Sequence, residues 1–155
     1  MSDLEEATIV IVGDRRLSRT AELAHLLAET FRVETYDGID PAELAAIVGA
    51  ACGPVSVVGV AGGASLALEA AAQHPVERVA LCEPLLVHGR VDLVAQPTLL
   101  LSCEDGGSRQ RRVARALWRL LPDCQLRELS CEAADPFVVA ELLEDFFAPV
   151  ARTAA

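Results

Sequence analysis

The chain has 155 residues, a length that fits one domain and allows a hydrophobic core without disulfide or metal support. Its 52% hydrophobic and 23% charged residues exclude a disordered chain, and its apolar runs are shorter than the roughly 20 residues that a membrane span needs. A net charge of −10 disfavours binding to nucleic-acid phosphates. We therefore expect one domain over residues 1–155 that binds neither membranes nor nucleic acid.

Strand and helix patterns alternate along the chain. In chain order, the periodicity predicts a strand at 8–14, a helix at 18–31, a strand at 32–37, a helix at 40–53, a strand at 54–60, a helix at 64–74, strands at 77–84 and 97–105, a helix at 108–121, a strand at 124–132 and a helix at 135–147. Asp40 and Asp135, each followed by proline, are typical of helix starts. The alternation predicts an α/β fold with a mainly parallel, six-stranded sheet and helices on both faces.

The amino terminus and the cysteines predict a cytoplasmic location. The start, MSDLEEATIVIV, carries acidic residues where a secretory signal carries basic ones. Five cysteines make an odd number without a CxxC pair, which indicates reduced thiols. Every basic residue is arginine, and lysine and asparagine are absent, a bias typical of a high-GC bacterial genome.

The order of these segments resembles the α/β-hydrolase superfamily from about Thr8 to Phe147. The stretch VGVAGGASLALEAAAQHPVERVALCEP is similar to the strand, elbow helix and next strand of that family, whose members carry a GxSxG motif. IVIVGD resembles the strand before the family's oxyanion turn, and QPTLLLSCEDGG the strand that presents the catalytic acid. The resemblance implies a truncated three-layer sandwich that lacks the usual lid.

The Ser-His-Asp triad of the family has no counterparts in the usual places. Ala61 stands where the nucleophilic serine would be, at the apex of GVAGG (residues 59–63, the elbow). The family acid aligns with Gly106, although Asp105 beside it could take its role, and no histidine lies shortly before Asp135. The standard mechanism therefore cannot be built, because it needs nucleophile and base within hydrogen-bond reach.

Main-chain amides at the elbow are candidates for binding a carbonyl or carboxylate. The predicted oxyanion or substrate-binding residues are Gly13, Asp14, Ala61 and Gly62. Such donors stabilise an oxyanion by about 2.7–4 kcal/mol each, aided here by the positive end of the following helix. Alternatively, Gly62 and Gly63 serve only to let helix and strand pack closely.

Three side chains are candidates for acid–base chemistry: Glu83, His88 and Asp105. The two acids follow predicted strands, at the sheet edge where open α/β sheets bind ligands. His88 lies in the short loop where family members insert a lid. Cys103 and Cys131 are alternative nucleophiles, provided that a neighbour lowers the pKa of the thiol. The alternatives are strand-end caps for the acids, a solvated histidine and buried structural thiols; no metal-ligand spacing is present.

Residues 108–121 contain five of the thirteen arginines. The predicted apolar face of this helix consists of Val113, Leu117, Leu120 and Leu121. Arg112, Arg115 and Arg119 then form an outward row, here named the arginine ridge. Such a ridge suits an acidic acyl or peptidyl carrier protein or its phosphopantetheine arm, and the alternative is a solvated, salt-bridged face.

Two main hypotheses for function follow. In the first, the protein is an enzyme, similar to an acyltransferase or thioesterase, that transfers, releases or cyclises an acyl group in bacterial specialised metabolism. It would need no cofactor of its own, and its substrate could be bound to phosphopantetheine on a partner. In the second, it is a catalytically inactive hydrolase relative that binds a ligand or docks a partner. A subunit that forms a homodimer through a sheet edge is a third alternative.

Overall fold

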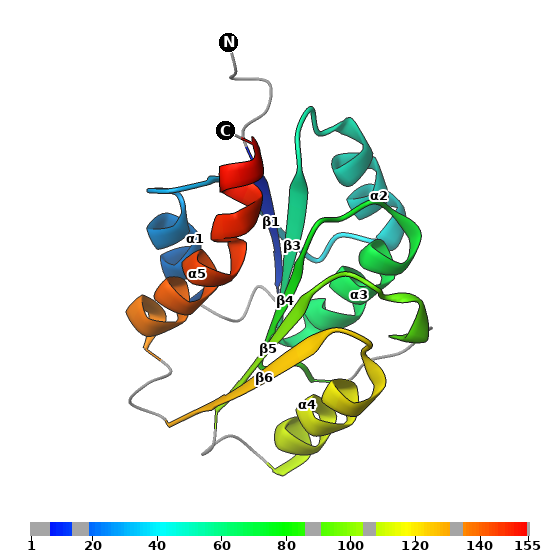
Figure 1. Cartoon of the computed structure of the whole chain (residues 1–155), viewed down its shortest axis with the longest axis vertical. Helices are drawn as coiled ribbons and strands as arrows, with labels where there is room; N and C mark the ends of the chain where they lie inside the picture. The colour runs from blue at the N-terminus through cyan, green and yellow to red at the C-terminus, as the bar shows by residue number, and fades with distance from the viewer. Residues whose placement is uncertain (1–6, 14–18, 86–90, 104–107, 131–134, 155) are drawn as a thin grey trace.

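The computed structural model describes residues 7–13, 19–85, 91–103, 108–130 and 135–154. Six strands form one sheet in the order β2-β1-β3-β4-β5-β6, and all neighbours are parallel (Figure 1). The strands are β1 (Thr8–Gly13), β2 (Arg32–Asp37), β3 (Val55–Val60), β4 (Val79–Cys82), β5 (Thr98–Cys103) and β6 (Cys124–Leu129). The predicted six-stranded parallel sheet is confirmed. The chain reverses its direction of travel across the sheet between β1 and β3, so the topological switch point, where open α/β sheets generally bind ligands, lies at their carboxyl ends.

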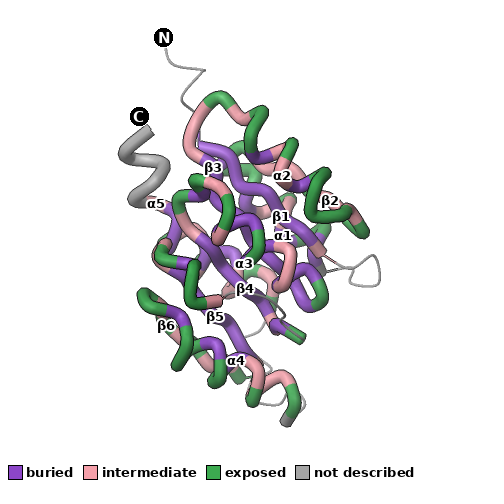
Figure 2. Tube along the Cα trace, turned by 90° about the vertical axis from the view of Figure 1, so that its right-hand side faces the viewer, coloured by how far each residue is buried: buried purple, intermediate pink, exposed green. Residues whose placement is uncertain are grey.

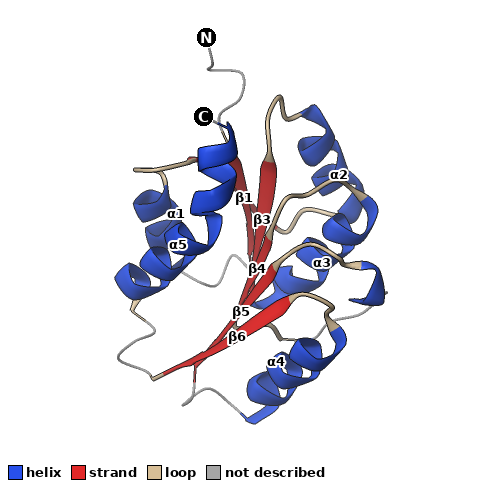
Figure 3. Ribbon diagram, viewed as in Figure 1, coloured by secondary structure: helices blue, strands red, loops and turns tan. Residues whose placement is uncertain are grey.

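Helices cover both faces of the sheet (Figure 3). They are α1 (Arg19–Leu27), α2 (Pro41–Ala50), α3 (Ala64–Gln73), α4 (Ser108–Leu120) and α5 (Pro136–Ala154), with short 3-10 turns η2 (Ala61–Gly63) and η3 (Val91–Leu93). α1 and α5 pack on one face, while α2, α3 and α4 pack on the other. The predicted three-layer arrangement is thus present. Among the described residues, no helix is both long and apolar enough to span a bilayer.

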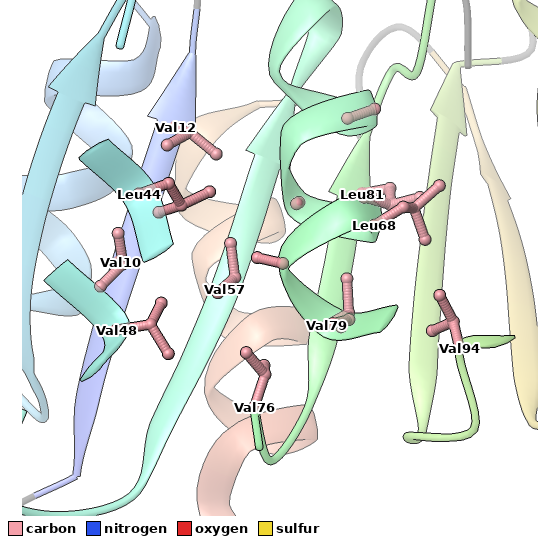
Figure 4. Packing of buried hydrophobic residues seen from close by; sticks show 14 of the residues in the cluster. Val10, Val12, Leu44, Val48, Val57, Leu68, Val76, Val79, Leu81 and Val94 are labelled. Atoms are coloured by element: carbon pink, nitrogen blue, oxygen red, sulfur yellow. The ribbon is translucent and has the colours of Figure 1, made fainter. Parts of the chain in front are cut away.

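The core consists of two apolar layers, one on each face of the sheet. Successive strand residues point to opposite faces, so Val57 packs against α2 and α3, and Val58 packs against α1 and α5. Figure 4 shows the first layer, in which Leu44 of α2 and Leu68 of α3 lie against the valines of β1, β3 and β4. The central strands are buried along their lengths, as expected for a parallel sheet covered on both sides (Figure 2).

Local sequence signals fix the helix starts. Asp40 Oδ1 accepts a hydrogen bond of 2.8 Å from the amide of Glu43, and Asp135 Oδ1 accepts one of 2.8 Å from the amide of Phe137. Both predicted caps are therefore confirmed. In α4, one predicted core residue is wrong: Leu120 is 62% exposed, because it lies about a quarter-turn from the buried line through Leu117 and Leu121.

Candidate functional site

β3 ends in a sharp bend at the elbow. Ala61 has φ +51°, in the left-handed region that costs a non-glycine residue roughly 1–2 kcal/mol. Residues Ala61–Gly63 form η2, and α3 begins directly at Ala64. The strand–turn–helix geometry of a nucleophile elbow is therefore present, with a methyl group in place of a nucleophile. Ala61 is 6% exposed and packs in the apolar layer under α1 and α5.

Two glycines make the elbow possible. A Cβ on Gly59 would lie 2.8 Å from both Cα of Ala64 and the carbonyl oxygen of Gly63. A Cβ on Gly63 would lie 2.2 Å from the carbonyl oxygen of Val12 in β1. A Cβ on Gly62 would meet nothing within 4 Å. The close-packing explanation therefore holds for Gly63 but not for Gly62, which is exposed in the middle of the turn.

The strain at Ala61 can be measured. Replacing Ala61 with glycine is expected to leave the free energy of unfolding unchanged within about 0.5 kcal/mol, because relief of the strained φ offsets the lost buried methyl contact and the freedom that glycine adds to the unfolded chain. Urea unfolding of both proteins would give the difference. Gly38, which also has a positive φ, provides the matched reverse change, since Gly38→Ala should destabilise although its Cβ would meet nothing within 4 Å.

β1 brings Gly13 to the same edge of the sheet. A Cβ on Gly13 would lie 3.2 Å from Oγ1 of Thr20 and 3.7 Å from Cβ of Val60, so the end of β1, the start of α1 and the end of β3 meet here. Thr20 is buried, and its hydroxyl has no hydrogen-bond partner among the residues that the structure describes. Sequence reasoning missed Thr20, because a threonine near a helix start reads as an ordinary capping residue. Asp14 lies outside the described residues.

Glu83 has an unexpected role at the end of β4. Its φ is +50°, and its amide makes the last regular ladder bond, to the carbonyl of Leu101 at 2.9 Å. The next rung is made by its own side chain, because Oε1 of Glu83 accepts the hydrogen bond from the amide of Cys103. The carboxylate thus replaces the main-chain acceptor that a parallel ladder would supply. This substitution lets the chain turn away from the sheet immediately after Cys82.

The turn after β4 contacts the elbow. The amide of Leu85 donates to the carbonyl of Ala61 at 3.4 Å. Val60 pairs with Cys82 in the sheet register, so the two non-glycine residues with positive φ in the described chain, Ala61 and Glu83, follow neighbouring strand ends. Backbone strain of this kind clusters at functional sites. The strand-end cap that was one alternative for Glu83 is therefore present, and it is coupled to the elbow.

The described cysteines differ in reactivity. Burial, followed by the nearby charge of Glu83, raises the pKa of the Cys82 thiol to about 12, which keeps it neutral and unreactive. Cys103 is partly exposed at the end of β5. Its candidacy as a nucleophile therefore stays a prediction, as does that of Cys131, which lies outside the described residues.

Two other predicted residues, His88 and Asp105, also fall outside the described residues, in segments 86–90 and 104–107. Their place relative to the elbow stays a prediction. Within the part of the chain that the structure describes, no group of three or more His, Cys, Asp or Glu side chains could hold a metal ion.

The arginine ridge is exposed on α4. Arg115 makes a two-pronged ion pair with Glu128 of β6, with Nε to Oε1 at 2.9 Å and Nη2 to Oε2 at 3.2 Å. These hydrogen bonds lower the pKa of Glu128. The salt-bridged alternative is therefore right for Arg115. Arg112 and Arg119 are exposed and make no ion pair in the described structure.

Comparison with known proteins gives similarity at the level of structure. No family model and no curated protein sequence matches the chain. An α/β hydrolase from Sphaerobacter thermophilus has a TM-score of 0.74 at 18% identity, over 92% of this chain and 93% of that one. MenH from S. aureus has a TM-score of 0.77 at 12% identity, over 96% of each chain. Est1E from Butyrivibrio proteoclasticus has a TM-score of 0.77 at 13% identity, over 94% of this chain and 88% of that one.

Proposed function

Because the chain has an α/β-hydrolase fold, we propose that it handles an acyl group, transferring it, releasing it from a carrier protein or cyclising it in bacterial specialised metabolism. One observation carries this proposal. The elbow keeps its strained bend at Ala61 even though it holds no nucleophile. Strain persists only where the surrounding structure imposes it, and it is often kept for function. A bend that orients main-chain amides toward an acyl oxygen would give it such a function.

The elbow would act as an oxyanion-binding turn without forming a covalent intermediate. Gly62 is exposed, so its amide is the proposed donor to the carbonyl oxygen. In release, a water adds to the thioester carbonyl while His88 takes the water proton. The C–S bond then breaks, the acid is released, and the departing thiolate takes the proton from His88. Asp105 or Glu83 would orient the histidine or exchange the proton.

The proposal is tested with acyl thioesters on purified acyl carrier proteins. The protein is expected to consume at least one thioester above the uncatalysed background, and His88→Ala is expected to slow that reaction by about 10²-fold or more. Mass spectrometry of the carrier measures both. Ala61→Ser serves as a control and should add no esterase activity, because no histidine lies at the family position. If no thioester in a broad panel is consumed, acyl chemistry is wrong.

A second function is favoured by a different observation. Ala61 is buried, and the Glu83 carboxylate accepts a hydrogen bond from the Cys103 amide. Both features are expected of a protein that has kept the fold of an enzyme but catalyses no reaction. Such a hydrolase relative would bind a ligand or partner and leave it chemically unchanged. Ligands that raise the melting temperature and are recovered intact would support it. The predicted homodimer would use β2 or β6, the two edge strands.

A further inference from the structure

The outer face of α4 combines positive charge with exposed apolar side chains. Leu117 and Leu121 face the sheet, which turns the arginine ridge outward. On the flanks of the ridge, Trp118 is 49% exposed and Leu120 is 62% exposed. Arginine and tryptophan are among the residue types that most often dominate protein–protein binding energy. This combination, on a chain of net charge −10, indicates a docking surface.

The ion pair between Arg115 and Glu128 holds one arginine of this surface in place before any partner binds. Glu128 holds the Arg115 guanidinium through two hydrogen bonds, while Arg112 and Arg119, three residues before it and four after it, make no ion pair in the described structure. The two unpaired cations are about 10 Å apart along the helix. A partner with carboxylates at a similar spacing could pair with both at once.

The surface begins at the edge of the sheet that carries the candidate site. α4 follows β5, so its first turn lies at the carboxyl edge of the sheet, where Glu83 and the elbow also lie. From there α4 runs back beside β5 and β6 (Figure 1). A protein bound along α4 would therefore have one end at the same edge of the sheet as the site.

We propose that the arginine ridge, with Trp118, docks an acidic protein that presents the acyl substrate on a flexible arm; this inference rests on the proposed function. Opposite charges would speed and orient the encounter, and salt would weaken it. The partner is identified by its acidic surface and its thioester-bearing arm. The ridge supplies the electrostatic attraction, and the tryptophan supplies apolar contact area.

Trp118 makes the test direct, since it is the single tryptophan of the chain. An acyl carrier protein without tryptophan, in the apo form that lacks the arm, is titrated at low salt while tryptophan fluorescence is recorded. Saturable binding that weakens with salt is expected. The double variant Arg112→Glu/Arg119→Glu should weaken binding by about tenfold or more, with circular dichroism confirming that it is folded.

A matched control separates local docking from the total charge. Arg32→Glu/Arg127→Glu changes the net charge by the same amount. Arg32 lies on β2 at the far edge of the sheet, and Arg127 pairs in register with Leu101, whose side chain is on the face covered by α1 and α5. The control should bind within about twofold of the unmodified protein. Equal losses in both double variants, or no salt-dependent binding at all, would overturn the docking proposal.

The docking proposal and the proposed acyl chemistry can be disproved independently of each other. The apo carrier has no thioester, so its binding does not depend on whether the site is active. Turnover of a small, free thioester tests the site without docking. The ridge variant should lose more activity toward the carrier-bound thioester than toward the free one, and an equal loss on both substrates would count against docking.

Discussion

Replacing Gly63 with alanine is expected to destabilise the protein by about 3 kcal/mol or more. The added Cβ would lie 2.2 Å from the carbonyl oxygen and 2.7 Å from the carbonyl carbon of Val12. These are main-chain atoms of β1, which is buried in the sheet between β2 and β3, so they cannot rotate away as a flexible side chain could. Relief requires α3 to move off the sheet. Urea unfolding of the two proteins measures the loss.

The neighbouring glycine provides the control for this prediction. Gly62→Ala makes the same chemical change one residue earlier, but its Cβ would meet nothing within 4 Å, and Gly62 does not have a positive φ. It should change the free energy of unfolding by no more than about 0.5 kcal/mol. Similar losses for both variants would show that the close approach of α3 to β1 does not define the elbow.

Much of the fold could be predicted because its signals are local. Each strand is an apolar run, and helix starts such as Asp40 with Pro41 depend on neighbours within three residues. The elbow was also predictable, because residues 59–63 keep both glycines that a GxSxG turn requires. The error at Leu120 has a simple cause, because Val113 lies at the half-buried edge of the stripe that the sheet covers, and Leu120, two turns later, lies about 20° further from its centre.

The features of the candidate site that sequence reasoning missed depend on contacts between distant segments. The amide that Glu83 caps belongs to Cys103, twenty residues later, and the pair exists only because β4 and β5 are neighbours. Arg115 and Glu128 meet for a similar reason, across the turn from α4 to β6. A sequence pattern can place a carboxylate at a strand end, but it cannot say which amide will donate a hydrogen bond to it.

A main-chain hydrogen bond links the elbow to the turn at Glu83. The Glu83 carboxylate replaces a rung of the sheet, which allows the chain to turn at φ +50°, and that turn delivers the Leu85 amide to the Ala61 carbonyl. A loss of the carboxylate should therefore reach the elbow, although Glu83 and Ala61 lie on different strands. Because of this coupling, a loss of turnover on replacing Glu83 does not by itself show that Glu83 is an acid–base group.

Two substitutions of Glu83 separate its structural role from its proposed chemical role. Glu83→Ala removes the acceptor for the Cys103 amide and is expected to cost about 1.5–3 kcal/mol of stability, together with about 10²-fold or more of thioester turnover. Glu83→Gln keeps a carbonyl oxygen in the acceptor position and removes the charge. It should keep most of the stability and still lose about 10²-fold in turnover, because an amide cannot accept and return a proton. Stability from urea unfolding and turnover by mass spectrometry are measured on the same preparations. If Glu83→Gln retains full turnover while Glu83→Ala does not, the carboxylate only positions the elbow, and Asp105 is left as the acid that assists His88.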